Sequence, residues 1–161
     1  CEEHKLTGRG WNPASVVRAT TKIDGVSFAF HSLHICKSGA NDGHAHSLAT
    51  TVLQKEITQR VIVVGDYNNN IGDNAMKTVE EAGLRATWSD LEINVAKEFT
   101  YNAQNPKKNL GVIDHILYNV DSGGRATDGG IIELEKPLSD HKPVWAEITV
   151  PRKIKELQAL R

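Results

Sequence analysis

The stretch that most constrains the fold is residues 61–70, with the sequence VIVVGDYNNN. Its four consecutive aliphatic residues are typical of a short strand that is buried on both faces. Gly65 allows a sharp turn where the strand stops, so Asp66 and Asn68 project from a loop at the carboxyl end of a core strand. Such loops often carry the chemistry of layered α/β proteins, although Gly, Asp and Asn are also the usual residues of a simple turn.

Overall composition predicts one globular core and no strong electrostatic field around the protein. The chain has 161 residues, of which 39% are hydrophobic and 24% are charged, and this is enough chain for one sizeable core. The net charge is −1, from 19 basic and 20 acidic residues, so bulk charge favours neither nucleic acid nor an anionic membrane. Binding of phosphate would therefore need a local site. No apolar run approaches ~20 residues, and the sequence predicts no membrane span.

Further apolar stretches predict the strands around residues 61–64. Residues 14–20 and 26–35 are rich in Val, Phe and Thr and flank an Asp-Gly pair, which predicts a β-hairpin. In strand alternation, His34 of this hairpin points away from the side that carries His31. Three more strands are expected at residues 112–120, 129–134 and 143–150.

Helices are expected between these strands and after them. Ser47 is predicted to cap a helix that runs to about residue 59. A second, shorter helix is expected at residues 74–83, with Gly83 just past its end. Residues 84–100 are left open between strand and loop. Residues 151–161 carry apolar residues at helical spacing among basic ones, which predicts a basic tail helix after a single domain.

Asp114 is a candidate functional residue because it falls within an apolar stretch. An ionised carboxylate in such a place costs several kcal/mol unless it is paired. Histidine is the natural partner, since an Asp-His pair fixes the tautomer of the imidazole and raises its pKa from about 6.5. Further carboxylates and an amide oxygen would form a hard site that suits Mg²⁺ or Mn²⁺ rather than zinc. Hydrolysis of a phosphate ester needs these groups.

Four short motifs, in order, carry a family resemblance. GDYN at residues 65–68, IDHI at 113–116 and SDHKPV at 139–144 resemble the C-terminal motifs of the endonuclease/exonuclease/phosphatase superfamily, which includes pancreatic deoxyribonuclease. SLHI at residues 32–35 resembles the earlier histidine motif of that family. The resemblance covers residues 9–148. It implies an α/β fold in which two sheets form a sandwich flanked by helices.

The resemblance also implies an activity and a set of roles. The activity is metal-dependent hydrolysis of a phosphodiester or phosphomonoester, with a nuclease favoured. Asp66 would orient or deprotonate the attacking water, and Asn68 would contact the phosphate or a metal. Asp114 would orient His141, which would stabilise the charge that develops on the phosphoryl group.

Three more residues receive roles from the same resemblance. Asp140 would bind Mg²⁺ or Mn²⁺, His34 would be a second imidazole directed at the phosphate, and Arg9 would bind phosphate ahead of the hairpin. Two positions depart from the family pattern. Val112 stands where the family often has a basic residue, and Tyr67 stands where it usually has Phe.

Some parts of the family pattern have no match in this sequence. The N-terminal half of the family supplies an Asn, a metal-binding Glu and an acidic partner for the first histidine. We therefore interpret residues 1–150 as the C-terminal portion of such a domain, inactive or feeble alone, with exposed apolar surface or dimerisation where the rest would lie. The alternative is a non-catalytic remnant or interaction module. The motifs leave DNA, RNA, a phospholipid and an inositol phosphate open as substrates, because loops set specificity.

Overall fold

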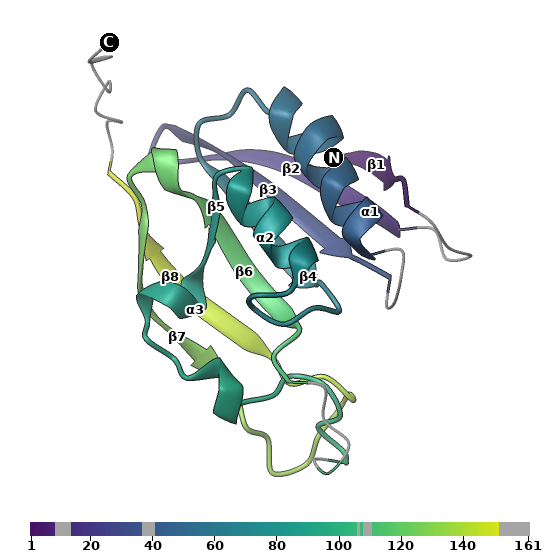
Figure 1. Cartoon of the computed structure of the whole chain (residues 1–161). Helices are drawn as coiled ribbons and strands as arrows, with labels where there is room; N and C mark the ends of the chain where they lie inside the picture. The colour runs from purple at the N-terminus through teal and green to yellow at the C-terminus, as the bar shows by residue number, and fades with distance from the viewer. Residues whose placement is uncertain (9–13, 37–40, 106, 108–110, 152–161) are drawn as a thin grey trace.

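The computed structural model describes residues 1–8, 14–36, 41–105, 107 and 111–151. They form a six-stranded sheet and a two-stranded sheet, with helices against the larger sheet (Figure 1). The strand order in the larger sheet is β1-β2-β3-β4-β6-β5, and β7 pairs with β8 in the smaller one. This architecture confirms the predicted α/β fold class with two sheets. A tail helix was predicted at residues 151–161, of which 152–161 lie outside the described residues.

Most of the strands follow the predicted stretches, and the hairpin pairing was expected from them. Neighbouring strands are antiparallel except β3 and β4, which run parallel and are joined by a helical crossover. The strands are β1 (Glu2–Leu6), β2 (Ala14–Ile23), β3 (Val26–His34), β4 (Val61–Asp66), β5 (Leu84–Ala86), β6 (Asp114–Asn119), β7 (Arg125–Ile131) and β8 (Val144–Thr149).

The β2-β3 hairpin is confirmed, whereas the predicted start of β7 is wrong. Asp24 and Gly25 form the hairpin turn with φ values of 50° and 79°, which an Asp-Gly pair adopts readily. β7 begins at Arg125, before the start of the strand predicted at residues 129–134. Close packing against β8 explains why glycines lie within β7, because a Cβ on Gly129 would lie 2.8 Å from the Trp145 carbonyl oxygen of β8. Glycine there lets the two backbones pair.

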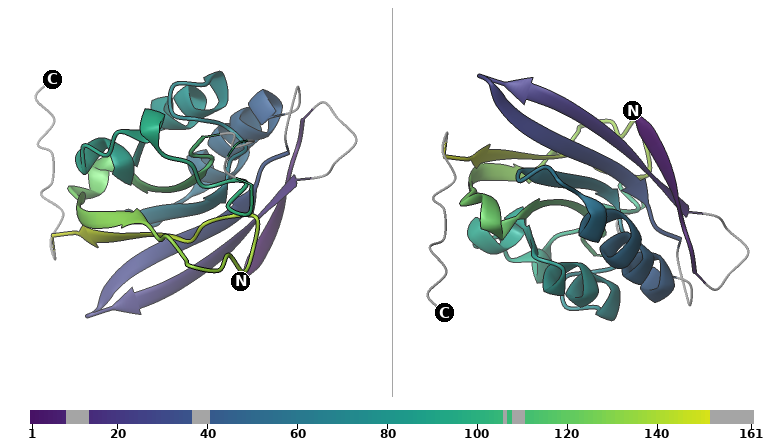
Figure 2. Two further views of the ribbon diagram at one scale, coloured as in Figure 1. Left: turned by 90° about the horizontal axis from the view of Figure 1, so that it is seen from below. Right: turned by 90° about the horizontal axis from the view of Figure 1, so that it is seen from above.

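Helices cover one face of the six-stranded sheet, as Figure 2 shows from two directions. The crossover helix begins earlier than predicted, and Ser47 is its last residue rather than its N-cap. The Ser47 hydroxyl is turned inward and accepts a hydrogen bond from the Thr7 amide at 3.0 Å. The helical segments are α1 (Asn41–Ser47), the π-helix η1 (Leu48–Val52), η2 (Leu53–Lys55), α2 (Asn74–Glu81), α3 (Thr87–Asp90), η3 (Val95–Lys97) and η5 (Val120–Ser122).

The hydrophobic core lies between these helices and the sheet. Val63 of β4, Leu117 of β6 and Met76 of α2 are fully buried in one cluster. On the opposite face of β4, Ile62 and Val64 are only half-buried, so the prediction of a strand buried on both faces is wrong for that face. The described residues supply only two strands to the second sheet, which leaves this face partly uncovered. No helix in the described part of the chain has the length and apolar character to cross a membrane.

A buried ion pair joins the hairpin to the segment that precedes β4. The Glu56 side chain is 2% exposed and accepts two hydrogen bonds from the Arg18 guanidinium, at 2.6 and 2.9 Å. The buried His31 ring lies 3.1 Å from the same carboxylate, and the Thr58 amide donates to it at 2.8 Å. The hydrogen bonds from Arg18 lower the pKa of Glu56 to about 2.

Replacing Glu56 with Gln should destabilise the fold by about 3 kcal/mol at neutral pH, because the Arg18 charge would lose its buried partner. The depressed pKa makes the contribution of Glu56 complete above about pH 4.5 and lost as the pH falls toward about 2. Urea unfolding at pH 7 and at pH 3 measures both effects. Glu81→Gln, at an exposed site on α2, is the control and should change stability by less than about 0.5 kcal/mol. Equal effects of the two substitutions would contradict the role of the ion pair.

Candidate active site

Two carboxylates meet at one end of the six-stranded sheet. Asp66 is the last residue of β4 and Asp114 is the first residue of β6, and the two are direct partners in the antiparallel register. Their side chains are 17% and 15% exposed. Burial and the nearby charge of Asp114 together raise the pKa of Asp66. Paired carboxylates with a perturbed pKa are an arrangement that proteins usually keep for function.

His141 lies against both carboxylates. Its Nδ1 is 2.9 Å from Asp114 Oδ2, and its Nε2 is 3.9 Å from Asp66 Oδ2. An ionised carboxylate can only accept, so His141 donates its Nδ1–H to Asp114. Burial lowers the pKa of His141, but the hydrogen bond and charge of Asp114 outweigh burial and raise it overall. The predicted contact between Asp114 and His141 is present, and its catalytic role stays a prediction.

The loop after β4 brings Asn68 and His34 to the same place. Asn68 has a φ of 50°, and its backbone amide donates to Asp66 Oδ1 at 2.7 Å. Its side-chain amide donates to the Ile35 carbonyl at 2.8 Å and lies 3.2 Å from His34 Nε2. His34 ends β3 with a side chain that is 72% exposed, and its Nε2 is 3.4 Å from Asp66 Oδ2. Four segments of the chain therefore converge around Asp66.

Gly65 is what allows the chain to turn at the end of β4. Its φ is 148°, and a Cβ at this position would lie 1.9 Å from the Leu33 carbonyl oxygen of β3. Any other residue would push β4 away from β3. The strand can therefore stay paired with β3 up to Asp66 and still release the chain into the loop that carries Asn68.

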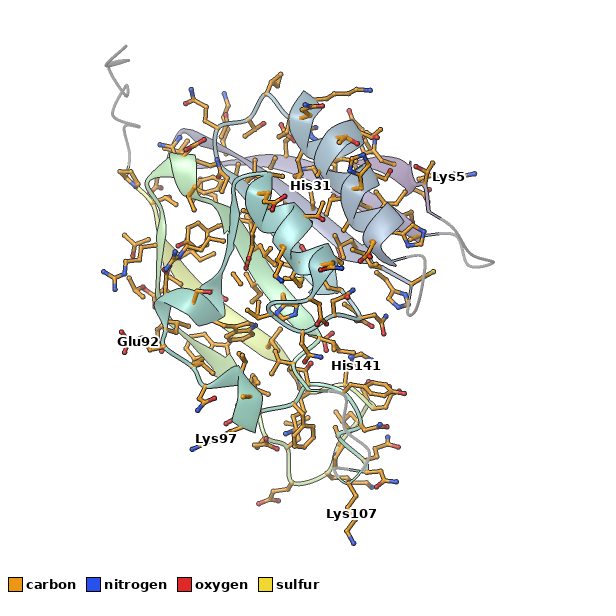
Figure 3. The ribbon with its side chains drawn as sticks, in the orientation of Figure 1. Lys5, His31, Glu92, Lys97, Lys107 and His141 are labelled. Carbon is orange, nitrogen blue, oxygen red and sulfur yellow. The ribbon has the colours of Figure 1, made fainter. Side chains whose placement is uncertain are left out.

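Asp140 and Arg9, two further predicted site residues, are placed differently. Asp140 directly precedes His141, but its side chain is exposed and lies outside the compact group of Asp66, Asp114 and His141. Its negative charge contributes to the raised pKa of His141, after the larger contributions of Asp114 and Asp66. Arg9 lies outside the described residues. Figure 3 shows His141 beyond the strand ends and well separated from His31, which lies behind the helices.

The donor atoms at this end of the sheet fit a hard cation. In the described part of the chain, ligand atoms of Asp66, Asp114 and His141 lie within 4.8 Å of one another. Because His141 Nδ1 is bonded to Asp114, this group is a hydrogen-bonded pair beside a carboxylate rather than a closed ligand cage. The oxygens of Asp66, Asn68 and the exposed Asp140 are the ligand type that Mg²⁺ or Mn²⁺ prefers.

Sequence reasoning missed a buried chain of hydrogen bonds behind the site. Trp88 Nε1–H donates to Nδ1 of His115 at 3.1 Å, and the other ring nitrogen of His115 lies 2.8 Å from the Asn69 carbonyl oxygen, to which it donates. Burial lowers the pKa of His115 and keeps the ring neutral. The sequence signal that could have found it is the position of His115 directly after Asp114 in a strand, because strand alternation turns His115 to the opposite face of the sheet. His115 thus ties β6 to the loop that carries Asn68.

Comparison with known proteins relates this fold to solved structures. No protein-family model and no curated protein sequence matches the chain. An endonuclease/exonuclease/phosphatase family protein from Bacteroides thetaiotaomicron superposes with a TM-score of 0.69 and 20% identity, over 94% of this chain and 65% of its own. This chain has the endonuclease/exonuclease/phosphatase fold. The resemblance predicted from the motifs is therefore confirmed at the level of the fold.

Two other structures with this fold carry more specific names. A mannosyl-6-phosphatase from Bacteroides thetaiotaomicron has a TM-score of 0.68 and 21% identity, over 92% of this chain and 65% of its own. TDP2 from D. rerio, complexed with a single-strand DNA product, has a TM-score of 0.67 and 19% identity, over 93% of this chain and 68% of its own. The chain thus spans about two thirds of the length of these relatives in fold.

Asp114→Asn should lower the pKa of His141, because the substitution removes the charge that stabilises the imidazolium. In the wild-type chain, protonated His141 stabilises the fold, and this contribution is complete below the unfolded pKa of about 6.5. The contribution is lost as the pH rises through the raised pKa of the folded state. The asparagine variant should lose that dependence of stability on pH. An NMR titration of the histidine ring protons measures the pKa directly.

Asp140→Asn is the matched control for this titration. It removes a neighbouring carboxylate that makes no hydrogen bond to the ring among the described contacts, so the pKa of His141 should fall less than in Asp114→Asn. If the two substitutions lower the pKa equally, the hydrogen bond from His141 to Asp114 does not have the dominant role described above.

Proposed function

We propose that this chain carries the catalytic pair and much of the phosphate site of a metal-dependent phosphoester hydrolase, acting on phosphodiesters and most suited to a nuclease. The observation that carries this proposal is the convergence of Asp66 with the hydrogen-bonded Asp114–His141 pair. The fold neighbours support it, since they include a protein named as a mannosyl-6-phosphatase and one complexed with a DNA product. Hydrolysis of a phosphomonoester is the second possibility, and it would use the same residues in the same roles.

Asp66 is proposed as the group that orients the attacking water and accepts its proton. A raised pKa makes its carboxylate a better base than an exposed aspartate. Its Oδ1 is occupied by the Asn68 amide, which fixes the orientation of the carboxylate. The water oxygen would bond to phosphorus as its proton passes to Asp66, while the bond from phosphorus to the ester oxygen breaks and that oxygen takes up a proton from solvent.

His141 is proposed as the donor that stabilises the charge developing on the phosphoryl oxygens. Asp114 accepts the Nδ1–H, so Nε2 is the ring nitrogen that remains to face the substrate. The raised pKa keeps the ring protonated nearer neutral pH, and a preorganised donor of this kind is worth several kcal/mol in a transition state. His34 and Asn68 are proposed to contact the phosphate on the other side, and Arg9 is proposed to bind phosphate as well.

Asp140 is the proposed metal ligand, together with oxygens of the loop after β4. Its exposed carboxylate adjoins His141 and is free of the hydrogen bond that engages Asp114. When bound, Mg²⁺ or Mn²⁺ would polarise the phosphoryl oxygens and offset their negative charge. Asp66 keeps its proposed role as the proton acceptor, and His141 keeps its role as the hydrogen-bond donor to the phosphoryl oxygens.

A non-catalytic interaction module is the alternative. The chain spans about two thirds of the length of its fold neighbours, and a module could keep the fold and bind phosphate esters without turnover. The raised pKa of Asp66 favours an enzyme, since a binding module has no need for a carboxylate that repels its own phosphate ligand.

In an assay on plasmid DNA and a chromogenic phosphodiester, hydrolysis should require Mg²⁺ or Mn²⁺ and stop with chelator. We expect the protein encoded by the full reading frame to be active and this chain alone to be feeble. His141→Ala and Asp66→Asn should each lower kcat by ~10²-fold or more. His46→Ala, at an exposed site on α1, is the control and should leave kcat unchanged.

Metal dependence separates Asp140 from His141 in the same assay. Asp140→Ala should raise the Mg²⁺ concentration needed for half-maximal activity, whereas His141→Ala should not, because only the first removes a hard oxygen ligand. Chelator-resistant hydrolysis, or wild-type rates from Asp66→Asn, would overturn the mechanism. Saturable binding of the ester with no turnover would favour the interaction module.

A further inference from the structure

The Asp114–His141 pair joins two segments that are 27 residues apart, so something must hold them in register. His141 is not within a strand of either sheet and makes only an isolated bridge, to Tyr101. A hydrogen bond of 2.9 Å between the two side chains needs both backbones to be fixed. Thr100, which lies between η3 and β6 in the sequence, contacts both of these backbone segments.

Thr100 holds the start of β6 through its side chain. Its Oγ1 accepts hydrogen bonds from the Ile113 amide at 3.0 Å and from the Asp114 amide at 3.1 Å. Thr100 is fully buried, so water does not compete for these two donors. Asp114 is the first residue of β6, and one hydroxyl therefore sets where that strand begins.

The backbone of Thr100 holds the segment that carries His141. Its carbonyl oxygen accepts a hydrogen bond from the Lys142 amide at 2.7 Å. The next residue, Tyr101, bridges to His141 and places its ring edge against the imidazole, with 5.1 Å between ring centroids. Thr100 thus contacts the backbone at Asp114 with its hydroxyl and the backbone beside His141 with its carbonyl.

We propose that Thr100 is a positioning residue that aligns Asp114 with His141. This inference rests on the proposed function, because alignment matters only if the pair acts on a substrate. Thr100 itself touches no reacting atom and acts through the other two residues. A serine would keep the hydroxyl acceptor, whereas valine has the same shape and cannot accept either amide.

The main test is an NMR measurement on the 161-residue chain, without metal or substrate. The proton that His141 Nδ1 donates to Asp114 should be protected from exchange with water and visible in the wild-type chain. Thr100→Val should broaden or abolish this signal, and Thr100→Ser should keep it. Thr87→Val is the matched control, since Thr87 is fully buried and its hydroxyl has no hydrogen-bond partner among the described residues. It should leave the signal intact.

A second measurement needs no variant and covers the case in which Thr100→Val unfolds. In the wild-type chain, the Ile113 and Asp114 amides should exchange with deuterium far more slowly than exposed amides. Rapid exchange at both amides would overturn the inference. So would a preserved His141 proton signal in a folded Thr100→Val chain, or its loss in Thr87→Val.

Kinetics distinguish failure of this inference from failure of the proposed function. In the protein of the full reading frame, Thr100→Val should lower kcat by ~10-fold to 100-fold with little change in KM, and Thr100→Ser should restore most of the rate. Loss of the proton signal without loss of kcat would keep the alignment and refute the role of the pair in hydrolysis. An unchanged signal with full activity in Thr100→Val would refute the alignment alone.

Discussion

The candidate site is organised around two carboxylates placed side by side at the ends of neighbouring strands. Asp66 and Asp114 are partners in the antiparallel register of β4 and β6, and burial together with their mutual repulsion raises the pKa of Asp66. Two ionised carboxylates with oxygens within 4.8 Å of each other repel unless hydrogen-bond donors surround them. His141 donates to Asp114, and the Asn68 amide donates to Asp66.

The fold supplies those donors from segments that only the sheet brings together. Gly65 lets β4 stay paired with β3 up to its last residue, while Thr100 fixes where β6 begins. Behind the site, the neutral His115 ring ties β6 to the loop after β4. The side chains of the candidate site are thus held in place by buried hydrogen bonds behind them, which makes this end of the sheet rigid.

The sequence predicted most of the sheet because its strands have strong local signals. The run at residues 61–64 and the Asp-Gly turn of the hairpin each determine structure within a few residues. The predicted start of α1 was wrong because the Ser47 side chain points inward. That position is set by a tertiary contact, the hydrogen bond from the Thr7 amide. Thr100 carried no local signal either, since its importance comes from amides at distant positions. The site motifs were visible only because their order matches a family pattern.

The most direct test of the account is a titration of the isotope-labelled chain with inorganic phosphate in the presence of Mg²⁺, followed by NMR. Phosphate should shift the signals of His34, Asn68 and His141 together, and His141→Ala should weaken the binding. Arg18, whose charge is paired with Glu56 on the same sheet, should be unaffected. Shifts centred on Arg18, or the same affinity in His141→Ala, would contradict the claim that these strand ends form one phosphate-directed site.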